Sequence, residues 1–132
     1  MNEIENIPQS LNMYDVALPD GWEILGYGVD MVTRNQYLRV KLPNGIVASI
    51  IRGQLTYGGP KGKWEIAPCW HEGGDNFSLM SSIEMYAVCE WIDVQGWLDN
   101  NDVMETLEEL ASIDAFRVST LKAAFYTLRN QS

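Results

Sequence analysis

Two runs of alternating apolar and polar residues surround an Asn-Gly pair in residues 37–52, which read YLRVKLPNGIVASIIR. Asn44 and Gly45 tolerate the positive φ angles of a tight type I′ turn, so the pattern predicts a β-hairpin. With a two-residue turn, one face of this hairpin is apolar and is expected to lie against the core. Its cross-strand pairs would be Leu42 with Val47, Val40 with Ser49, and Leu38 with Ile51.

The other face of the predicted hairpin carries several basic side chains. It would present Tyr37, Arg39, Lys41, Ala48, Ile50 and Arg52. In this register Arg52 lies opposite Tyr37, where a cation–π contact would form. A candidate basic binding face therefore consists of Tyr37, Arg39, Lys41 and Arg52.

Further strands are predicted on both sides of the hairpin. Residues 22–29 form an apolar run whose two glycines, Gly26 and Gly28, indicate a bulge or a close backbone approach. Residues 63–68 have strand character, and Pro68 is expected to end that strand because proline cannot donate to a ladder. Together these segments predict one antiparallel sheet.

Residues 81–92 fit two kinds of element. From Ile83 to Trp91 the residues alternate as in a half-buried strand. Ser81 and Glu84, however, fit the capping box of a helix, and the apolar residues that follow also have helical spacing. We favour a strand for this segment.

The last third of the chain shows two helical patterns. Asp99 suits the N-cap of the first helix, and Asp102 and Glu105 lie in its early turns, where acids suit the helix dipole. The apolar stripe of this helix is Val103, Met104, Leu107, Leu110 and Ala111. A second helix is predicted from about Ala115 to Leu128, with Asp114 as its cap. Its stripe is Val118, Leu121, Phe125 and Leu128.

Because strands precede helices, we expect an α+β fold, with an antiparallel sheet of three to five strands and two C-terminal helices packed on one face. The 132 residues suit a single domain, 1–132, with residues 1–20 as an irregular N-terminal segment. Five Trp, six Tyr and three Phe supply core material that a disordered chain lacks. The sequence has no apolar run of about 18 residues, so no membrane association is expected.

The N-terminus begins with acidic residues and lacks the basic start and apolar stretch of a secretory signal. A cytoplasmic location is therefore expected.

The net charge of −9 is distributed in blocks. Residues 1–30 carry six acids and no base, residues 31–63 carry six bases and no acid, and residues 64–116 carry twelve acids without Lys or Arg. The tail from residue 117 adds three bases. Such blocks either mark surfaces for an oppositely charged partner or neutralise each other across the fold. The net charge makes nucleic acid an unfavourable partner.

Within the acidic block, a candidate partner-binding set imitates nucleic-acid phosphates. It consists of Glu84, Glu90, Asp99, Asp102, Glu105, Glu108 and Glu109. The alternative interpretation is a capped and solvated helix face, because none of these carboxylates has the spacing that acid–base catalysis requires.

Cys69, His71 and Cys89 are the remaining residues with reactive chemistry. In a reducing compartment the two cysteines are expected to stay thiols. A structural zinc site has two pairs of closely spaced ligands, and here only Cys69 and His71 are close in sequence. His71 is the one histidine of the chain. We therefore assign no catalytic residue, cofactor or metal, and keep a small enzyme with a site near these three residues as an alternative.

Two stretches carry a family resemblance. Residues 51–67, which contain a Tyr-Gly-Gly turn and end in Trp64-Glu65-Ile66-Ala67, are followed by Gly96-Trp97-Leu98-Asp99 at the start of an acidic helix. This pattern resembles small uncharacterised accessory proteins of tailed phages and prophages. The resemblance covers residues 37 to 112 and implies an accessory protein made in the cytoplasm of a bacterial host. It implies no catalytic residues.

These observations favour a non-enzymatic accessory protein that binds a host or defence protein with a basic surface, as an acidic mimic of nucleic acid. The enzyme near Cys69 and His71 is one alternative. The other is a self-assembling structural or regulatory protein, a homo-oligomer in which the basic block of one copy docks on the acidic block of the next.

Overall fold

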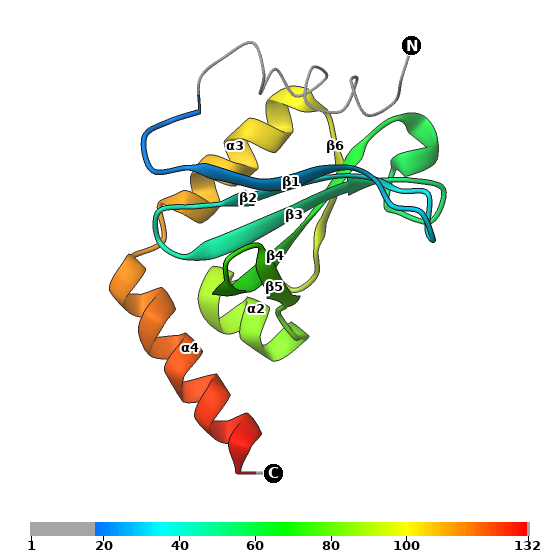
Figure 1. Ribbon diagram of the computed structural model, residues 1–132. Coiled ribbons are helices and arrows are strands. Elements are labelled where there is room, and N and C mark those ends of the chain that lie inside the picture. Colours follow the sequence, from blue (N-terminus) through cyan, green and yellow to red (C-terminus); the bar gives the residue numbers. More distant parts are fainter. Residues whose placement is uncertain (1–17, 132) are drawn as a thin grey trace.

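The computed structural model describes residues 18–131 and shows an antiparallel sheet accompanied by three α-helices (Figure 1). The strands are β1 (Glu23–Val29), β2 (Gln36–Lys41), β3 (Ile46–Arg52), β4 (Trp64–Gly73), β5 (Asn76–Leu79) and β6 (Gln95–Leu98). The helices are the 3-10 turn η1 (Gly59–Lys61), α2 (Ser82–Cys89), α3 (Asn100–Ala111) and α4 (Ala115–Asn130). The predicted α+β class is confirmed, while most of the predicted irregular segment, residues 1–17, lies outside the described residues.

The ten-residue strand β4 organises one edge of the sheet. The strands follow the order β1-β2-β3-β4-β5, and β6 also pairs with β4. Cys69 pairs with Leu79 of β5, whereas Ile66 pairs with Gln95 of β6, so the two short strands share the outer edge of β4. This arrangement leaves Pro68 between them.

Pro68 does not end β4, contrary to the sequence prediction, because the strand continues to Gly73. The carbonyl of Pro68 accepts a hydrogen bond from the backbone N–H of Met80. In an antiparallel strand the nitrogen and carbonyl of one residue point to the same side, so the missing N–H faces the outer edge and not β3. A proline at this position costs no hydrogen bond to the central sheet.

The β2–β3 hairpin is confirmed, but its predicted register is wrong by one residue. Val40 pairs with Ala48 and not with Ser49. The backbone N–H of Leu42 donates to Ile46, so the loop has three residues and not two. Its last residue, Gly45, has a φ of 94°, as in hairpin loops that combine a type I turn with a left-handed residue.

Because the observed register differs from the predicted one by one residue, each side chain of β3 lies on the face of the sheet opposite to the predicted one. Leu38, Ile50 and Ile66 are cross-strand neighbours on the face of the sheet that the helices cover, which we call the helical face. Arg39, Ser49 and Ala67 lie in line on the face that we call the opposite face.

Arg52 is the predicted binding residue that the corrected register moves. It pairs with Gln36 and not with Tyr37, so the predicted contact between Arg52 and Tyr37 is wrong. Its guanidinium instead lies 4.1 Å from the centre of the Trp64 ring. Arg52 is therefore separated from Tyr37, Arg39 and Lys41, which share the opposite face.

Residues 82–89 form helix α2, so the predicted strand is wrong and the capping-box alternative is confirmed. The Ser81 hydroxyl accepts from the N–H of Glu84, and the Glu84 carboxylate accepts from the N–H of Ser81. Met85 and Val88 point into the core, whereas Ile83, which a half-buried strand would bury, is 74% exposed. The capping box and the spacing of three between the buried residues Met85 and Val88 therefore favour a helix over a strand in this segment.

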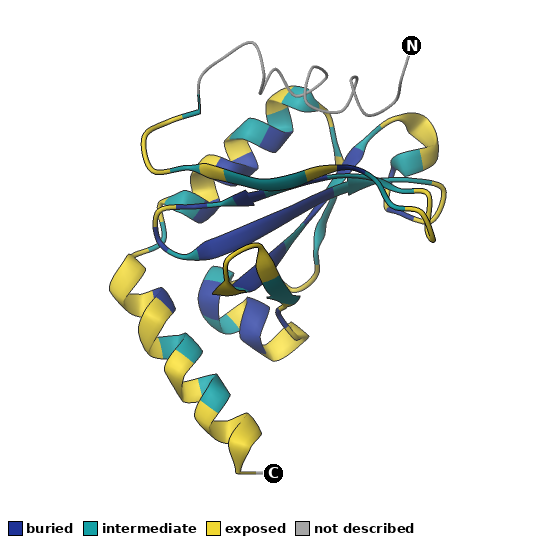
Figure 2. Ribbon diagram, in the orientation of Figure 1, coloured by how far each residue is buried: buried dark blue, intermediate teal, exposed yellow. Residues whose placement is uncertain are grey.

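The core fills the space between the helical face of the sheet and the helices (Figure 2). Strand residues in this core include Leu38, Val40, Ala48, Ile50, Trp64, Ile66 and Trp70. Helix α3 adds Val103, Leu107 and Leu110, which confirms its predicted stripe. Asp99 caps α3 through a capping box with Asp102.

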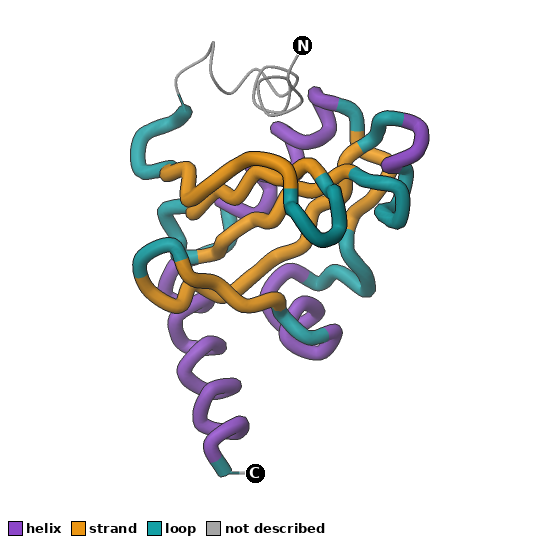
Figure 3. Tube along the Cα trace, turned by 45° about the vertical axis from the view of Figure 1, so that its right-hand side comes forward, coloured by secondary structure: helices purple, strands orange, loops and turns teal. Residues whose placement is uncertain are grey.

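Helix α4 extends beyond the sheet towards the C-terminus (Figure 3), and Arg129 in its last turn pairs with Glu84 of α2. Asp114 caps it as predicted. Val118 is buried, and the rings of Phe125 and Tyr126 lie 6.4 and 6.3 Å from that of Trp70. Leu128, predicted on the same stripe, is exposed.

Asn44 joins the hairpin loop to the end of α3. Its amide nitrogen donates to the carbonyls of Leu110 and Ile113 at 2.8 and 2.9 Å, and its oxygen accepts from the N–H of Ile46. Asn44 is 8% exposed, so water cannot readily replace these three bonds. The same residue therefore shapes the loop and satisfies carbonyls at the end of a helix.

We predict that Asn44→Ala lowers the free energy of unfolding by about 2–4 kcal/mol, because it leaves buried backbone groups without partners. Urea denaturation measures this loss. Asn101→Ala, at an exposed position of α3, is the control and is expected to cost less than about 0.5 kcal/mol. Equal stabilities of the two variants would contradict the role of Asn44.

Candidate interaction surface

The outer side of α3 presents three carboxylates to solvent. Glu105, Glu108 and Glu109 are all exposed, at spacings of three and four residues that place them on one side of the helix. Within residues 18–131, none of the three forms an ion pair. The predicted acidic surface therefore includes this side of α3.

Asp99 and Asp102 have a local structural role. The N–H of Asp102 donates to Asp99, and the N–H of Asp99 donates to Asp102. The hydrogen bond from the Asp102 backbone is the main cause that lowers the pKa of Asp99, with a smaller contribution from the positive charge of Lys63. Both carboxylates cap α3, and Lys63 offsets part of the charge at this end.

Glu84 lies inside the protein and not on the acidic surface. It is 4% exposed, and both carboxylate oxygens accept from the guanidinium of Arg129 at 2.9 and 2.7 Å. Burial acts to raise the pKa of Glu84, but the hydrogen bond from Ser81 and the bonds and charge of Arg129 together lower it. The structure thus removes Glu84 from the predicted partner-binding set and gives it a role in holding α4 against α2.

Glu90, the last member of the predicted set, lies beside a groove between the helices. Glu90 ends α2 with a φ of 62°, and it lines a groove of about 310 Å³ together with Glu109 and Asp114. Arg117 also lines the groove, but its guanidinium donates to the carbonyl of Ala87. Three carboxylates from three helical elements therefore meet around one groove.

An apolar hollow lies on the outer side of α2. Ser82, Ile83, Tyr86 and Ile92 line this space of about 350 Å³. Ile83, Tyr86 and Ile92 are 74%, 58% and 85% exposed. We call these three residues the apolar hollow. Exposed apolar groups gathered in this way are typical of protein contact sites.

The hollow was not predicted from the sequence, because residues 81–92 were predicted to form a strand. In a strand, Ile83 and Tyr86 would point to opposite faces, whereas a spacing of three places them on one side of a helix. The capping box at Ser81 and Glu84 was the signal that could have revealed the arrangement.

Of the predicted basic face, Tyr37, Arg39 and Lys41 lie on the opposite face of the sheet. The guanidinium of Arg39 lies 4.2 Å from the ring centre of Tyr37 and 4.6 Å from that of Phe77, a residue that the sequence reading did not select. The basic block is therefore not one continuous surface.

Cys69, His71 and Cys89 do not form one site. Cys69 lies on the opposite face, and burial raises the pKa of its thiol to about 12. Cys89 lines the groove beside Glu109, and burial raises its thiol pKa to about 12 as well. His71 is hydrogen-bonded to the carbonyl of Gly74. Both cysteines are free thiols, and a raised pKa disfavours the nucleophilic thiolate.

Across residues 18–131, no group of three or more His, Cys, Asp or Glu side chains is arranged to hold a metal ion. In the same range, no helix combines the length and apolar character needed to cross a membrane.

No family model, no curated protein and no solved structure matches this chain. The resemblance to phage and prophage proteins therefore stays a prediction.

We predict that Glu84→Gln lowers the free energy of unfolding at pH 7 by about 1–3 kcal/mol, because it breaks the ion pair between a buried carboxylate and the partly exposed Arg129 yet keeps a capping side chain. The pKa of Glu84 in the folded protein lies below its ordinary value of 4.5. The stabilisation is therefore complete above that pH and is lost as the pH falls through the folded pKa.

Urea denaturation of wild type and Glu84→Gln from pH 7 to pH 3 tests this linkage. The difference in free energy of unfolding between the two proteins is expected to decrease towards pH 3. Glu105→Gln, at an exposed position, serves as the control and should follow the wild type. A gap that stays constant with pH would rule out the ionised pair as the source of the stability.

Proposed function

We propose that this chain is a non-enzymatic binding protein that docks on a partner protein with a basic surface, using the apolar hollow, Glu90 at the end of α2 and the exposed carboxylates of α3. The observation that carries the proposal is the hollow itself, with Ile83, Tyr86 and Ile92 largely exposed. Fully buried apolar contacts at the centre of an interface supply most of its affinity.

The charge around the hollow indicates the kind of partner. Residues 64–116 contain no Lys or Arg, and the neighbouring Glu90 and Asp93 are exposed. The bases of α4 are engaged elsewhere: Arg117 donates to Ala87, Lys122 donates to His71, and Arg129 pairs with Glu84. Hydrogen bonds to carbonyls do not neutralise a cation, so Arg117 offsets part of the negative field of the groove that it lines. The three carboxylates of that groove outnumber it, and the remaining negative field would steer a basic protein towards this side.

The outer side of α3 supports the more specific idea of nucleic-acid mimicry. Carboxylates three and four residues apart are separated by about 4.5–6 Å along a helix axis. One strand of DNA carries a charge about every 3.4 Å. Glu105, Glu108 and Glu109 thus approach the linear charge density of a single strand, and we extend the proposal to a partner whose basic groove normally holds nucleic acid.

An accessory role towards a host or defence protein in an infected bacterium is part of this proposal and rests on the phage resemblance alone. Self-assembly is the competing hypothesis for the same surface. Bases at Arg34 and Lys61 are exposed at the loop end of the sheet and could meet the acids of a second copy.

We predict that two single variants each reduce capture of the partner. Ile92→Ser removes apolar contact from the hollow, and Glu108→Lys reverses a charge on α3. Each should weaken binding by about tenfold or more, equivalent to about 1.4 kcal/mol. Asp75→Lys makes the same change of charge at an exposed turn between β4 and β5 and is the matched control.

The measurement is affinity capture from a lysate of the organism that carries the gene, with quantitative mass spectrometry and a parallel wash at high salt. The proposal requires one basic protein that the wild type and Asp75→Lys retain, that both other variants lose, and that salt releases. If all three variants retain the same amount of the basic protein as the wild type, the proposal is refuted. Sedimentation showing salt-sensitive oligomers of the chain alone, with no other protein retained, would favour self-assembly instead.

A further inference from the structure

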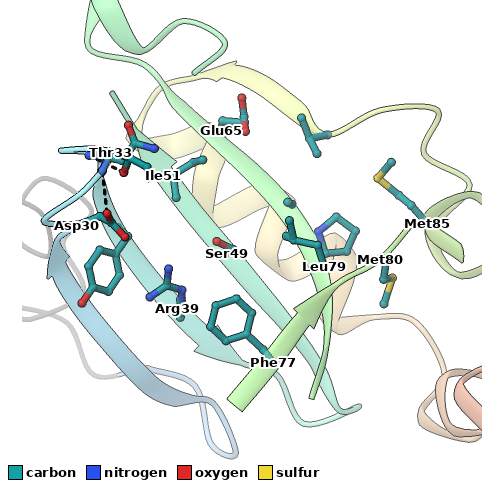
Figure 4. A pocket seen from close by; sticks show the side chains of 15 residues that line it. Asp30, Thr33, Arg39, Ser49, Ile51, Glu65, Phe77, Leu79, Met80 and Met85 are labelled. Atoms are coloured by element: carbon teal, nitrogen blue, oxygen red, sulfur yellow. Dashed lines mark hydrogen bonds between the residues drawn. The ribbon is translucent and has the colours of Figure 1, made fainter. Parts of the chain in front are cut away.

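A second binding feature begins on the opposite face of the sheet and extends past the outer edge of β4 to Met85 of α2. It is a pocket of about 320 Å³ that crosses strands β2, β3 and β4 (Figure 4). Arg39 and Phe77 lie towards one end, and Met80 and Met85 lie towards the other. The pocket thus has a polar end, where Asp30 and Arg39 lie, and an apolar end.

Arg39 is held at the polar end by two aromatic rings, Tyr37 at 4.2 Å and Phe77 at 4.6 Å from ring centre to guanidinium. The neighbouring strand β1 leaves room for the Tyr37 ring because Gly26 and Gly28 lie next to it without side chains. A Cβ atom built at Gly28 would lie 3.4 Å from the Tyr37 hydroxyl. The sequence therefore fixes the position of this guanidinium by packing on both sides of its plane.

The hydrogen-bonding edge of the guanidinium is unused. The Nε atom of Arg39 is buried and has no hydrogen-bond partner, and no ion pair joins Arg39 to another residue of the described chain. Leaving a buried N–H group unpaired costs about 1–3 kcal/mol, and more when the group is charged. A guanidinium offers two parallel N–H groups that match a carboxylate.

The carboxylates of the pocket wall already have other partners. Asp30 accepts hydrogen bonds from the backbone N–H groups of Val32 and Thr33, both at 2.8 Å. Glu65 accepts one from the N–H of Tyr57 at 2.9 Å. The positive charge of Arg39 helps to lower the pKa of Asp30, but no described carboxylate forms an ion pair with the guanidinium. Its N–H groups are therefore open to an external anion.

The rest of the wall is suited to an apolar chain. Beyond Ser49 the pocket reaches the outer edge of β4, between β5 and β6, where Pro68 interrupts the pairing. The side chains at this end are Pro68, Leu79, Met80, Met85 and Val94. Methionine side chains adapt readily to apolar ligands of different shape.

We propose that this pocket binds a small organic carboxylate with an apolar chain, the carboxylate on Arg39 and the chain towards Met80 and Met85. The N–H groups of one guanidinium match one carboxylate, whereas phosphate sites usually gather several N–H donors. At about 30 Å³ per water-sized group, the pocket holds a ligand of roughly ten non-hydrogen atoms. Octanoate has this size and serves as the probe.

The test is titration of the full chain with octanoate, and separately with octanamide, which has the same shape without the charge. Backbone amide resonances of residues such as Ser49, Phe77 and Leu79 report binding by NMR. We expect octanoate to shift these resonances and to bind about tenfold or more tightly than octanamide. Arg39→Met should remove this preference.

Lys41→Met is the matched control, because Lys41 lies on the same strand and face but does not line the pocket. It should bind octanoate as the wild type does. Equal affinity of the wild type for octanoate and octanamide, shifts confined to other surfaces, or no binding at millimolar octanoate would each overturn the proposal. The comparison of the two probes on the wild type decides the matter even if Arg39→Met fails to fold.

Discussion

The register of the β2–β3 hairpin determines on which face of the sheet each functional side chain lies. Pairing of Val40 with Ala48 sends Ala48 and Ile50 into the core and places Ser49 beside Arg39 on the opposite face. A shift by one residue would bury Ser49 and expose Ile50. The three-residue loop that sets this register also supplies Asn44, whose amide holds the end of α3. Loop, sheet and helix are thus tied to one register.

This constraint separates the two candidate binding surfaces. The core side of the sheet supports α2 and α3, which carry the apolar hollow and the carboxylates of the proposed protein interface. The opposite face holds the Arg39 end of the second pocket, whose other end reaches Met85 of α2 at the outer edge of β4. The blocks of charge in the sequence therefore do not simply neutralise each other: Lys63 lies near Asp99, but Arg39 and the carboxylates of α3 project from different sides of the sheet.

Local signals predicted much of the fold. The hairpin, both C-terminal helices and the caps Asp99 and Asp114 follow from turn chemistry, periodicity and N-cap preference, which act within a few residues. The hairpin register was not predictable in this way, because it depends on contacts between Asn44 and α3 more than sixty residues away. The continuation of β4 through Pro68 likewise depends on which neighbouring strands share its edge.

The candidate sites were less predictable than the fold. Sequence position alone grouped Glu84 with the exposed acids, but its burial beside Arg129 requires α2 and α4 to pack together. Phe77 and Arg39 are distant in the sequence and meet only because β5 and β2 lie on the same sheet. The apolar hollow was missed because one segment was assigned to the wrong element.

The most direct test of this account is the cross-strand Hα–Hα NOE pattern of the β2–β3 hairpin. The hydrogen bond from Leu42 to Ile46 makes Arg39 and Ser49 a non-hydrogen-bonded pair, whose Hα atoms lie close together. We predict a strong NOE between the Hα atoms of Arg39 and Ser49. A strong NOE between Val40 and Ser49 instead would indicate the two-residue turn and contradict the division of functional side chains between the two faces.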